Sequence, residues 1–168
     1  MHPNSMTIMK TFVEEHQAQD MTVVDIGSYD INGTYKEFFT GDYIGVDIIA
    51  GPNVDIIMGS EEWNNLSKID LVISGQTLEH VADIPKLMSE IYKVLKPNGL
   101  LYIIAPSTGP RHDYPIWVGN FSIERMSEVV VAAGFEIISC TISPVEPFND
   151  CCCLAKKPEV KKFHRKEI

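Results

Sequence analysis

The stretch that decides the fold spans residues 70–107 and reads DLVISGQTLEHVADIPKLMSEIYKVLKPNGLLYIIAPS. The apolar runs at residues 69–74 and 100–107 have the composition of buried parallel strands. Between them, residues 83–95 carry apolar side chains at the spacing of an amphipathic helix, and the PNG triplet that follows ends this helix. A strand, a helix and a second strand in this order predict one unit of a parallel sheet.

The same alternation continues on both sides of this unit. The closing pair of strands has no helical pattern between them, which predicts a hairpin and one antiparallel strand. We therefore expect an α/β fold with a doubly wound, mostly parallel sheet. The further predicted elements are a helix over residues 6–19, strands over 22–27, 43–48 and 53–58, a helix from the N-cap Ser122 to Gly134, and strands over 135–143 and 151–157.

Length and charge limit the classes of function. The 168 residues fit a single domain, and the formal net charge is −9. Residues 156–168 carry six basic and two acidic side chains, so the rest of the chain is more acidic still. An acidic body repels phosphate backbones, so we expect no nucleic-acid partner. We expect one domain over residues 1–157 and a basic, flexible tail over 158–168 that is either solvated or in contact with an anionic partner.

Membrane segments and cysteine frameworks are not indicated by the sequence. No apolar run reaches the roughly 18 residues of a membrane helix, and the first ten residues do not resemble a signal peptide. Cys151, Cys152 and Cys153 are consecutive, and with Cys140 they form no CxxC spacing. We therefore expect reduced, partly buried strand cysteines in a cytoplasmic protein, and no metal site.

The first two strand ends suggest a binding site for a nucleoside. The loop GSYDINGTY follows the first strand but lacks G-x-G-x-x-G, because Tyr29 stands at the second glycine position and would obstruct a pyrophosphate. A nucleoside without phosphates fits better, although Gly27 alone also fits a tight strand-to-helix turn. Asp47 follows the second strand at the distance typical of a carboxylate that binds a ribose, the alternative being a solvated loop residue.

The next two strand ends add polar and aromatic candidates. Ser60, Glu61 and Trp63 follow the third strand and are candidates to contact an adenine ring. Gly75, Gln76 and His80 follow the fourth strand, which places them beside the same crevice.

Three motifs carry a resemblance to a known family. The segments DIGS (residues 25–28), VD (46–47) and residues 70–107 resemble the class I S-adenosylmethionine-dependent methyltransferases, most of all the branch that acts on small molecules, lipids and sugars. The resemblance covers residues 22–157 and implies a Rossmann-like, three-layer α/β/α fold whose seven-stranded sheet has its last strand antiparallel. The family's loop is usually D-x-G-x-G-x-G, whereas this chain keeps only Gly27 and has Tyr29 and Ile31 at the other two glycines.

The resemblance also implies a cofactor and its contacts. The cofactor is S-adenosylmethionine, and the product is S-adenosylhomocysteine. The implied cofactor-binding residues are Asp25, Gly27 and Ser28 at the methionine end, Asp47 and Ile48 at the ribose, Ser60 and Glu61 at the adenine, and Gly75 and Gln76 on the sulfonium side.

Methyl transfer is an in-line displacement, which depends mainly on orientation and needs a base only for a protonated acceptor. The candidate catalytic residues are His80 and His112, although His80 could instead orient the helix over residues 83–95. Candidate substrate-binding residues are Tyr29, Arg111, Tyr114 and Trp117, of which the last three lie in a loop that could also simply pack over the sheet edge.

The sequence favours an active methyltransferase with a small-molecule, sugar or lipid-linked acceptor. An inactive methyltransferase-like binding module and another nucleotide-dependent enzyme are the alternatives. The sheet and its helices use nearly all 168 residues, so the site is expected to be open to a large acceptor or closed by a second subunit of a homo-oligomer.

Overall fold

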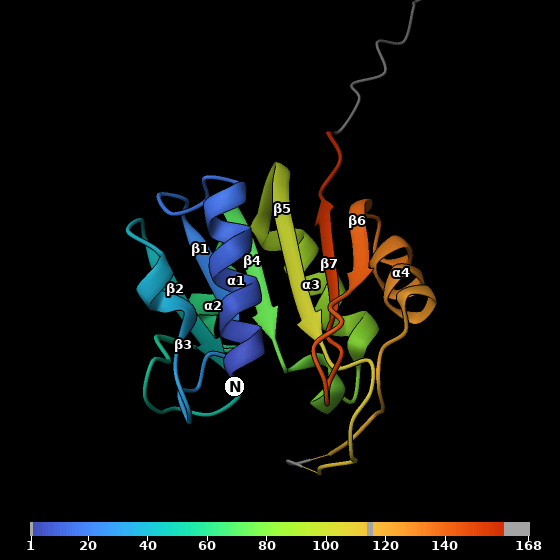
Figure 1. Ribbon diagram of the computed structural model, residues 1–168. Coiled ribbons are helices and arrows are strands. Elements are labelled where there is room, and N and C mark those ends of the chain that lie inside the picture. Colours follow the sequence, from blue (N-terminus) through green and yellow to red (C-terminus); the bar gives the residue numbers. More distant parts are fainter. Residues whose placement is uncertain (1, 114–115, 160–168) are drawn as a thin grey trace, which may run out of the picture.

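A seven-stranded sheet forms the centre of the computed structural model, which describes residues 2–113 and 116–159 (Figure 1). The strand order is β3-β2-β1-β4-β5-β7-β6. The predicted α/β, Rossmann-like fold is thereby confirmed. The strands are β1 (Val23–Ile26), β2 (Tyr43–Asp47), β3 (Ile56–Ile57), β4 (Ile69–Gly75), β5 (Leu95–Ala105), β6 (Glu136–Ile142) and β7 (Cys151–Lys156).

The pairing changes direction only at β7. Strands β1 to β5 pair in parallel, whereas β7 lies antiparallel between β5 and β6. Ile104 of β5 is opposite Cys152 of β7, which in turn is opposite Thr141 of β6. The short connection from β6 to β7 leaves no room for a crossover helix, so the strands form a hairpin. The prediction of an antiparallel last strand is confirmed.

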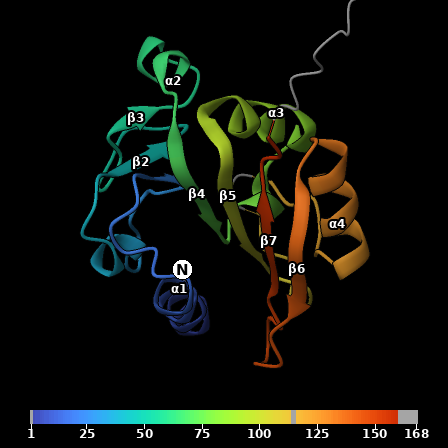
Figure 2. The same ribbon diagram turned by 90° about the horizontal axis from the view of Figure 1, so that it is seen from above.

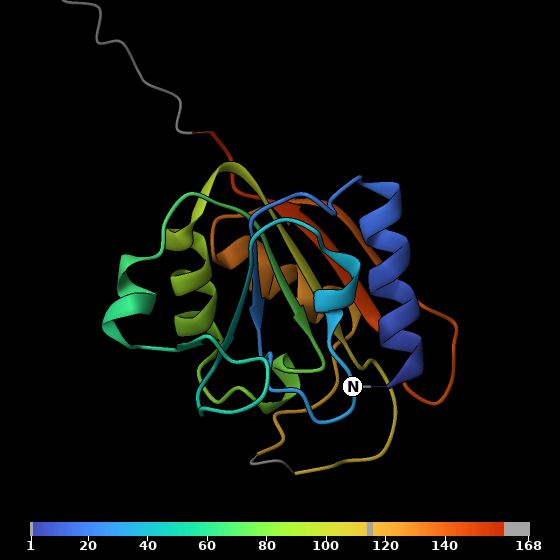
Figure 3. The same ribbon diagram turned by 90° about the vertical axis from the view of Figure 1, so that its left-hand side faces the viewer.

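Helices cover the two faces of the sheet unequally, as the side view in Figure 3 shows. One face carries α1 (Pro3–Glu15) and the short 3₁₀ helix η1 (Tyr35–Phe38). The other face carries α2 (Glu61–Asn65), α3 (Ile84–Val94) and α4 (Ile123–Ala132). Figure 2 shows α1 on one side of the sheet, with α3 and α4 on the other. In the described part of the chain, no helix is both long and apolar enough to cross a membrane.

The two faces have separate hydrophobic cores. Ile91 of α3 and Met126 of α4 are fully buried in one core, and Met9 of α1 is fully buried in the other. The alternation of a strand distributes the consecutive cysteines between them: Cys151 and Cys153 belong to the first core and Cys152 to the second. All four cysteines are free thiols in the structure.

Several element boundaries differ from the prediction. The first helix begins at Pro3 rather than residue 6, because the His2 side chain caps it and proline suits the first helical position. The strand expected over residues 53–58 is reduced to Ile56–Ile57. Strand β5 already begins at Leu95, with a register irregularity where the PNG triplet lies.

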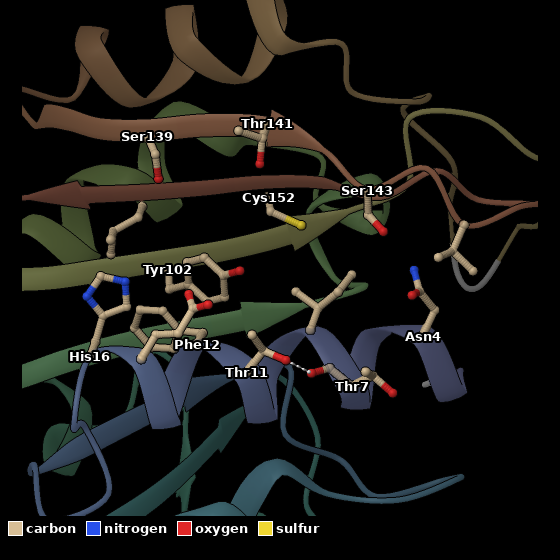
Figure 4. Close-up of a pocket in the computed structure, with 14 residues that line it drawn as sticks. Asn4, Thr7, Thr11, Phe12, His16, Tyr102, Ser139, Thr141, Ser143 and Cys152 are labelled. Atoms are coloured by element: carbon tan, nitrogen blue, oxygen red, sulfur yellow. Dashed lines mark hydrogen bonds between the residues drawn. The ribbon is translucent and has the colours of Figure 1, made fainter.

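A groove of about 410 Å³ lies between α1 and the strands β6 and β7 (Figure 4). Phe12 of α1 stacks on Tyr102 of β5 at its floor, with a centroid separation of 4.0 Å. Ser139 and Thr141 of β6 present hydroxyl groups to it. Such polar side chains need no apolar cover, which explains how this part of the sheet stays open on the α1 face.

Candidate functional site

A cavity of about 920 Å³ opens at the carboxyl ends of β1, β2 and β4. The chain builds the sheet in one direction from β1 to β3 and then returns to place β4 on the other side of β1, so this is the topological switch point. The volume lies in the upper part of the range for ligand sites. Gly27, Tyr29, Asp47, Ile48, Gly75, Gln76 and His80, all predicted as site residues, line it.

Gly27 forms the turn that ends β1. Its φ of 80° lies in the left-handed region, and a Cβ atom there would lie 2.1 Å from Oγ1 of Thr77. Thr77 follows β4, and its hydroxyl donates to the Gly75 carbonyl at 3.2 Å. Only glycine therefore allows the loops after β1 and β4 to approach this closely.

Asp47 is held at the end of β2 by two backbone amides. The Tyr29 amide donates to one carboxylate oxygen at 3.1 Å, and the Ile48 amide donates to the other at 2.7 Å. The carboxylate keeps further lone pairs for a ligand in the cavity. Beside it, Ile48 and Ile49 are 65% and 54% exposed, so the rim next to the carboxylate is apolar.

Asp25 and Ser28 are buried instead of lining the cavity among the described residues. Asp25 accepts a hydrogen bond from the Tyr43 hydroxyl. Burial raises the pKa of Asp25 to about 7. The hydrogen bond from Tyr43 lowers this pKa in part, and the nearby charge of Asp47 raises it further. Asp25 and Ser28 therefore stabilise the loops around the cavity from the protein interior.

Of the three residues after β3 that the sequence suggested, the structure places Trp63 at the cavity but not Ser60 or Glu61. Ser60 caps α2 by accepting a hydrogen bond from the Trp63 amide at 3.2 Å, and Glu61 is exposed. Neither is among the lining residues that the structure describes, whereas Met58, Gly59, Trp63 and Asn64 are. A short helix turned the polar pair away, and a five-residue helix leaves little periodicity in the sequence.

Gln76 connects the cavity to the N-terminal helix. It has a φ of 56°, and its side chain donates to the Asp150 carboxylate at 2.8 Å. Asn4 donates to the same carboxylate at 2.8 Å, and His2 Nε2 lies 3.5 Å from it. Burial alone would raise the pKa of Asp150, but the nearby His2 ring and the hydrogen bonds from Gln76 and Asn4 lower it.

The acceptor-side candidates gather around η2 (Leu78–His80). The His80 ring lies 4.9 Å from the His112 ring, and the His112 ring lies 4.6 Å from that of Trp117. Arg111 points away to an exposed ion pair with Asp113 at 3.1 Å. Arg111, His112 and Trp117 are not among the described lining residues of the cavity. Tyr114 falls outside the described residues.

Glu79 is a residue of this region that sequence reasoning missed. Its side chain is fully buried, and neither carboxylate oxygen has a hydrogen-bond partner among the described residues. Burial raises its pKa to about 8, with a smaller contribution from the charge of Asp150. Thr77 was also missed. No pattern marks either residue, because burial at a strand end is a tertiary property.

Comparisons with known proteins agree with this geometry. A family model described as "Methyltransferase domain" matches residues 7–140. A protein of Mycolicibacterium smegmatis named "probable S-adenosylmethionine-dependent methyltransferase" is 29% identical over 94 residues. That match covers 51% of this chain and 37% of the relative, so the chain matches well under half of the relative's length.

Solved structures show the same fold at low sequence identity. One is the 1,6-didemethyltoxoflavin-N1-methyltransferase of Burkholderia thailandensis with 1,6-didemethyltoxoflavin and S-adenosylhomocysteine bound: TM-score 0.72, 16% identity, 92% of this chain and 79% of that chain. Another is a SAM-dependent methyltransferase from Aquifex aeolicus: TM-score 0.64, 17% identity, 94% of this chain and 99% of that chain. With the family model matching most of its length, the chain belongs to the class I S-adenosylmethionine-dependent methyltransferases.

Proposed function

We propose that the chain is an active methyltransferase that transfers a methyl group from S-adenosylmethionine to a small-molecule, sugar or lipid-linked acceptor. The observation that carries this proposal is the Asp47 carboxylate, which two backbone amides fix at the cavity rim beside the Gly27 turn. A carboxylate fixed in this way is suited to accept hydrogen bonds from both hydroxyls of a ribose. When bound, the cofactor supplies a methyl group on a sulfonium, which is a good leaving group.

The described residues fit this cofactor. Ile48 and Ile49 offer an apolar surface beside Asp47 for a flat adenine ring. The Tyr29 ring packs against Gly51, where a Cβ atom would lie 2.0 Å from it, and so fills the space a pyrophosphate would need. Because the Tyr29 amide also holds Asp47, we assign Tyr29 to the cofactor side of the cavity rather than to the acceptor.

The acceptor side lies at the other end of the cavity, around His80 and His112. His80 lines the cavity, and its Nδ1 atom hydrogen-bonds the Ile116 carbonyl at 2.7 Å, which leaves Nε2 for the acceptor. These residues would orient the nucleophile in line with the methyl group and take its proton where it carries one. Orientation is the larger contribution, up to roughly 7–11 kcal/mol of the barrier.

Two observations support the acceptor class, and a third supports the compartment. The structurally similar Burkholderia enzyme carries the small molecule 1,6-didemethyltoxoflavin. The chain's net charge of −9 disfavours nucleic acid. Free cysteines fit the reducing cytoplasm in which we place the protein. A second subunit closing the acceptor side remains part of the proposal, and light scattering with ligands bound would detect it as a dimer mass.

Calorimetric titration tests the cofactor assignment. S-adenosylmethionine and S-adenosylhomocysteine should bind with one site per chain, whereas NAD should not. The Asp47→Ala variant should weaken S-adenosylhomocysteine binding by about 10- to 150-fold, because hydrogen bonds to a charged group contribute about 1.5–3 kcal/mol. Asp55→Ala is the matched control, since Asp55 also accepts a backbone amide, that of Gly45 at 2.8 Å, but is not among the described lining residues.

Equal affinities in the two variants would overturn the role of Asp47. An inactive binding module would give a different result. It would bind S-adenosylhomocysteine normally, but it would form no S-adenosylhomocysteine from S-adenosylmethionine with any pool of acceptors. This second possibility rests on one observation: the chain lacks two of the glycines that the family's cofactor loop usually has.

A further inference from the structure

We propose that Glu79, His80 and His112 form a binding site for a divalent cation of the zinc class, next to the acceptor side of the cavity. One ligand atom from each residue lies within 4.8 Å of the other two. The residues come from two segments, the 3₁₀ helix η2 and the loop after β5, which the fold brings together.

The Glu79 carboxylate and the His80 ring face each other without a hydrogen bond. Nε2 of His80 lies 3.8 Å from Oε1 of Glu79, a distance too long for a hydrogen bond. In a tetrahedral zinc site with bonds of about 2.0–2.1 Å, neighbouring ligand atoms lie about 3.4 Å apart. A small adjustment therefore places a cation between them, and the exposed position of His112 lets the third ligand move closer.

The histidines are already oriented as metal ligands. Nδ1 of His80 bonds the Ile116 carbonyl at 2.7 Å, and Nδ1 of His112 bonds the Pro110 carbonyl at 3.2 Å. A carbonyl accepts only, so each Nδ1 carries a proton, and in the neutral form of each ring Nε2 then has a free lone pair. Metal-bound histidines almost always donate their other ring nitrogen in this way, which fixes the ring and its tautomer.

Glu79 supplies an independent observation. Its side chain is fully buried, and neither oxygen has a hydrogen-bond partner in the described part of the chain. A buried carboxylate without partners is costly unless it stays neutral or binds a cation. The neutral His80 ring has no hydrogen on the Nε2 atom that faces Glu79, so a cation between them satisfies both groups at once.

The ligand set indicates the kind of cation and its use. Two histidines and one glutamate are a known set for zinc sites that keep a fourth position open. His80 lines the cavity, so this open position adjoins the acceptor. The net charge of −9 also favours the approach of cations. Mg²⁺, which prefers oxygen ligands, should bind this set poorly.

What the site does for the reaction rests on the proposed function. With a cation bound, the Nε2 atoms of His80 and His112 would be ligands and would not act as the base; an acceptor hydroxyl at the open position would instead lose its proton to water more readily. Its oxygen lone pair would then form the bond to the methyl carbon, and the electrons of the broken carbon–sulfur bond would return to sulfur. The methylated atom of the acceptor would therefore be an oxygen.

Titration with ZnCl₂ by calorimetry, and with CoCl₂ by visible absorption, tests the binding itself. We expect one site per chain and ligand-field bands of a four-coordinate Co²⁺. His112→Ala should weaken binding at least tenfold. Because His112 is exposed, this variant leaves both cores intact. Glu79→Gln should weaken binding as strongly, and its circular dichroism and melting temperature show whether it folds.

His16→Ala and Cys140→Ser are the matched controls. His16 follows α1 and is exposed, and Cys140 is a half-buried thiol 3.9 Å from Cys151, so each could bind zinc adventitiously. Neither change should alter the affinity. Absence of binding, or binding that His112→Ala leaves unchanged, would overturn the cation site. If the cation site is overturned but S-adenosylhomocysteine still binds normally, the proposed function stands. If the cation binds but no methyl transfer is found, the proposed function is contradicted and the cation site stands.

Discussion

The two ends of the cavity are built in different ways. At the cofactor end, backbone groups do most of the positioning: the Gly27 turn brings two loops together, and the amides of Tyr29 and Ile48 hold Asp47. At the acceptor end, the side chains of Glu79, His80 and His112 do the positioning, and one of them comes from an exposed loop.

This difference has a physical consequence. A site built from backbone at strand ends shares its stability with the sheet, so damage to it should appear as a loss of folding free energy. A site built from loop side chains can change without affecting the cores, so damage there should appear in binding or turnover. The following variants test this contrast.

The Gly27→Ala variant should have the largest effect on stability. It introduces both a left-handed alanine and a contact of 2.1 Å with Thr77 Oγ1, which together should lower the free energy of unfolding by about 4 kcal/mol. Gly59→Ala is the matched control, because Gly59 has a φ of 85° and also lines the cavity, but an added Cβ meets no atom within 4 Å. It should cost about 1 kcal/mol.

Urea unfolding followed by circular dichroism measures both variants. A second change, Thr77→Ala, removes the two closest atoms and should recover part of the loss in Gly27→Ala. Equal losses at Gly27 and Gly59 would show that backbone strain alone matters and that the close approach of the β1 and β4 loops does not.

The buried carboxylate of Asp25 should make stability depend on pH. Its pKa of about 7 exceeds the value of 3.8 expected in the unfolded chain, so the folded chain retains a proton that the unfolded chain has lost. The contribution of Asp25 to the free energy of unfolding should therefore fall as the pH rises from about 4 through about 7, while the buried Glu79 adds a fall of its own up to about pH 8. Asp25→Asn removes the contribution of Asp25, leaves that of Glu79, and should stabilise the chain by about 3 kcal/mol at pH 8.

Unfolding of both proteins at pH 4 and pH 8 gives the answer. The two should be similar in stability at the lower pH and differ at the higher one. Asp42→Asn, on the exposed turn before β2, is the control and should leave the slope unchanged. A steeper fall in Asp25→Asn than in the unmodified chain would contradict a raised pKa.

The contrast between the two ends also decides what the sequence could predict. Residues 70–107 carry their own periodicity, so the strand, helix and strand were found in the right order, with only the start of β5 displaced, from residue 100 to Leu95. Gly27 and Asp47 lie at strand ends, where the order of elements alone brings them to one edge. Local pattern and topology were sufficient there.

The rest depends on tertiary contacts that no local pattern records. The sequence predicts Ser60 and Glu61 as adenine contacts, but they begin the short helix α2 and do not line the described cavity, where Met58 and Asn64 lie instead. Glu79 is notable because its carboxylate is buried without a hydrogen-bond partner among the described residues, which no sequence pattern reveals. The approach of His112 to η2 is also hidden in the sequence, because α3 and β5 separate the two and His112 lies in a loop without periodicity.

Gln76 joins the cavity to α1 through Asp150, and its loss should have an intermediate effect. Gln76→Ala removes a 2.8 Å hydrogen bond to a carboxylate and should lower the free energy of unfolding by about 2 kcal/mol. Because Gln76 has a φ of 56°, Gln76→Gly removes the same bond but relieves the backbone, so it should cost less than Gln76→Ala.

Hydrogen exchange locates the damage. Asn4 of α1 shares the Asp150 carboxylate, so the amides of α1 should exchange faster in both variants, while those of α4 should not change. Uniform acceleration over the whole chain would mean that the hydrogen bond acts on global stability and does not connect α1 to the cavity.

The smallest effect is expected from Ile48→Ser at the cofactor rim. Ile48 is 65% exposed, so the free chain should unfold with nearly the same free energy as before. A ligand that covers this side chain would bury part of its apolar surface, and losing about 1 kcal/mol of that contact weakens S-adenosylhomocysteine binding about fivefold. Ile138→Ser, at a 52% exposed position on β6, should change neither quantity. If Ile48→Ser instead raised the KM of the acceptor and left cofactor affinity unchanged, the assignment of the two ends would have to be reversed.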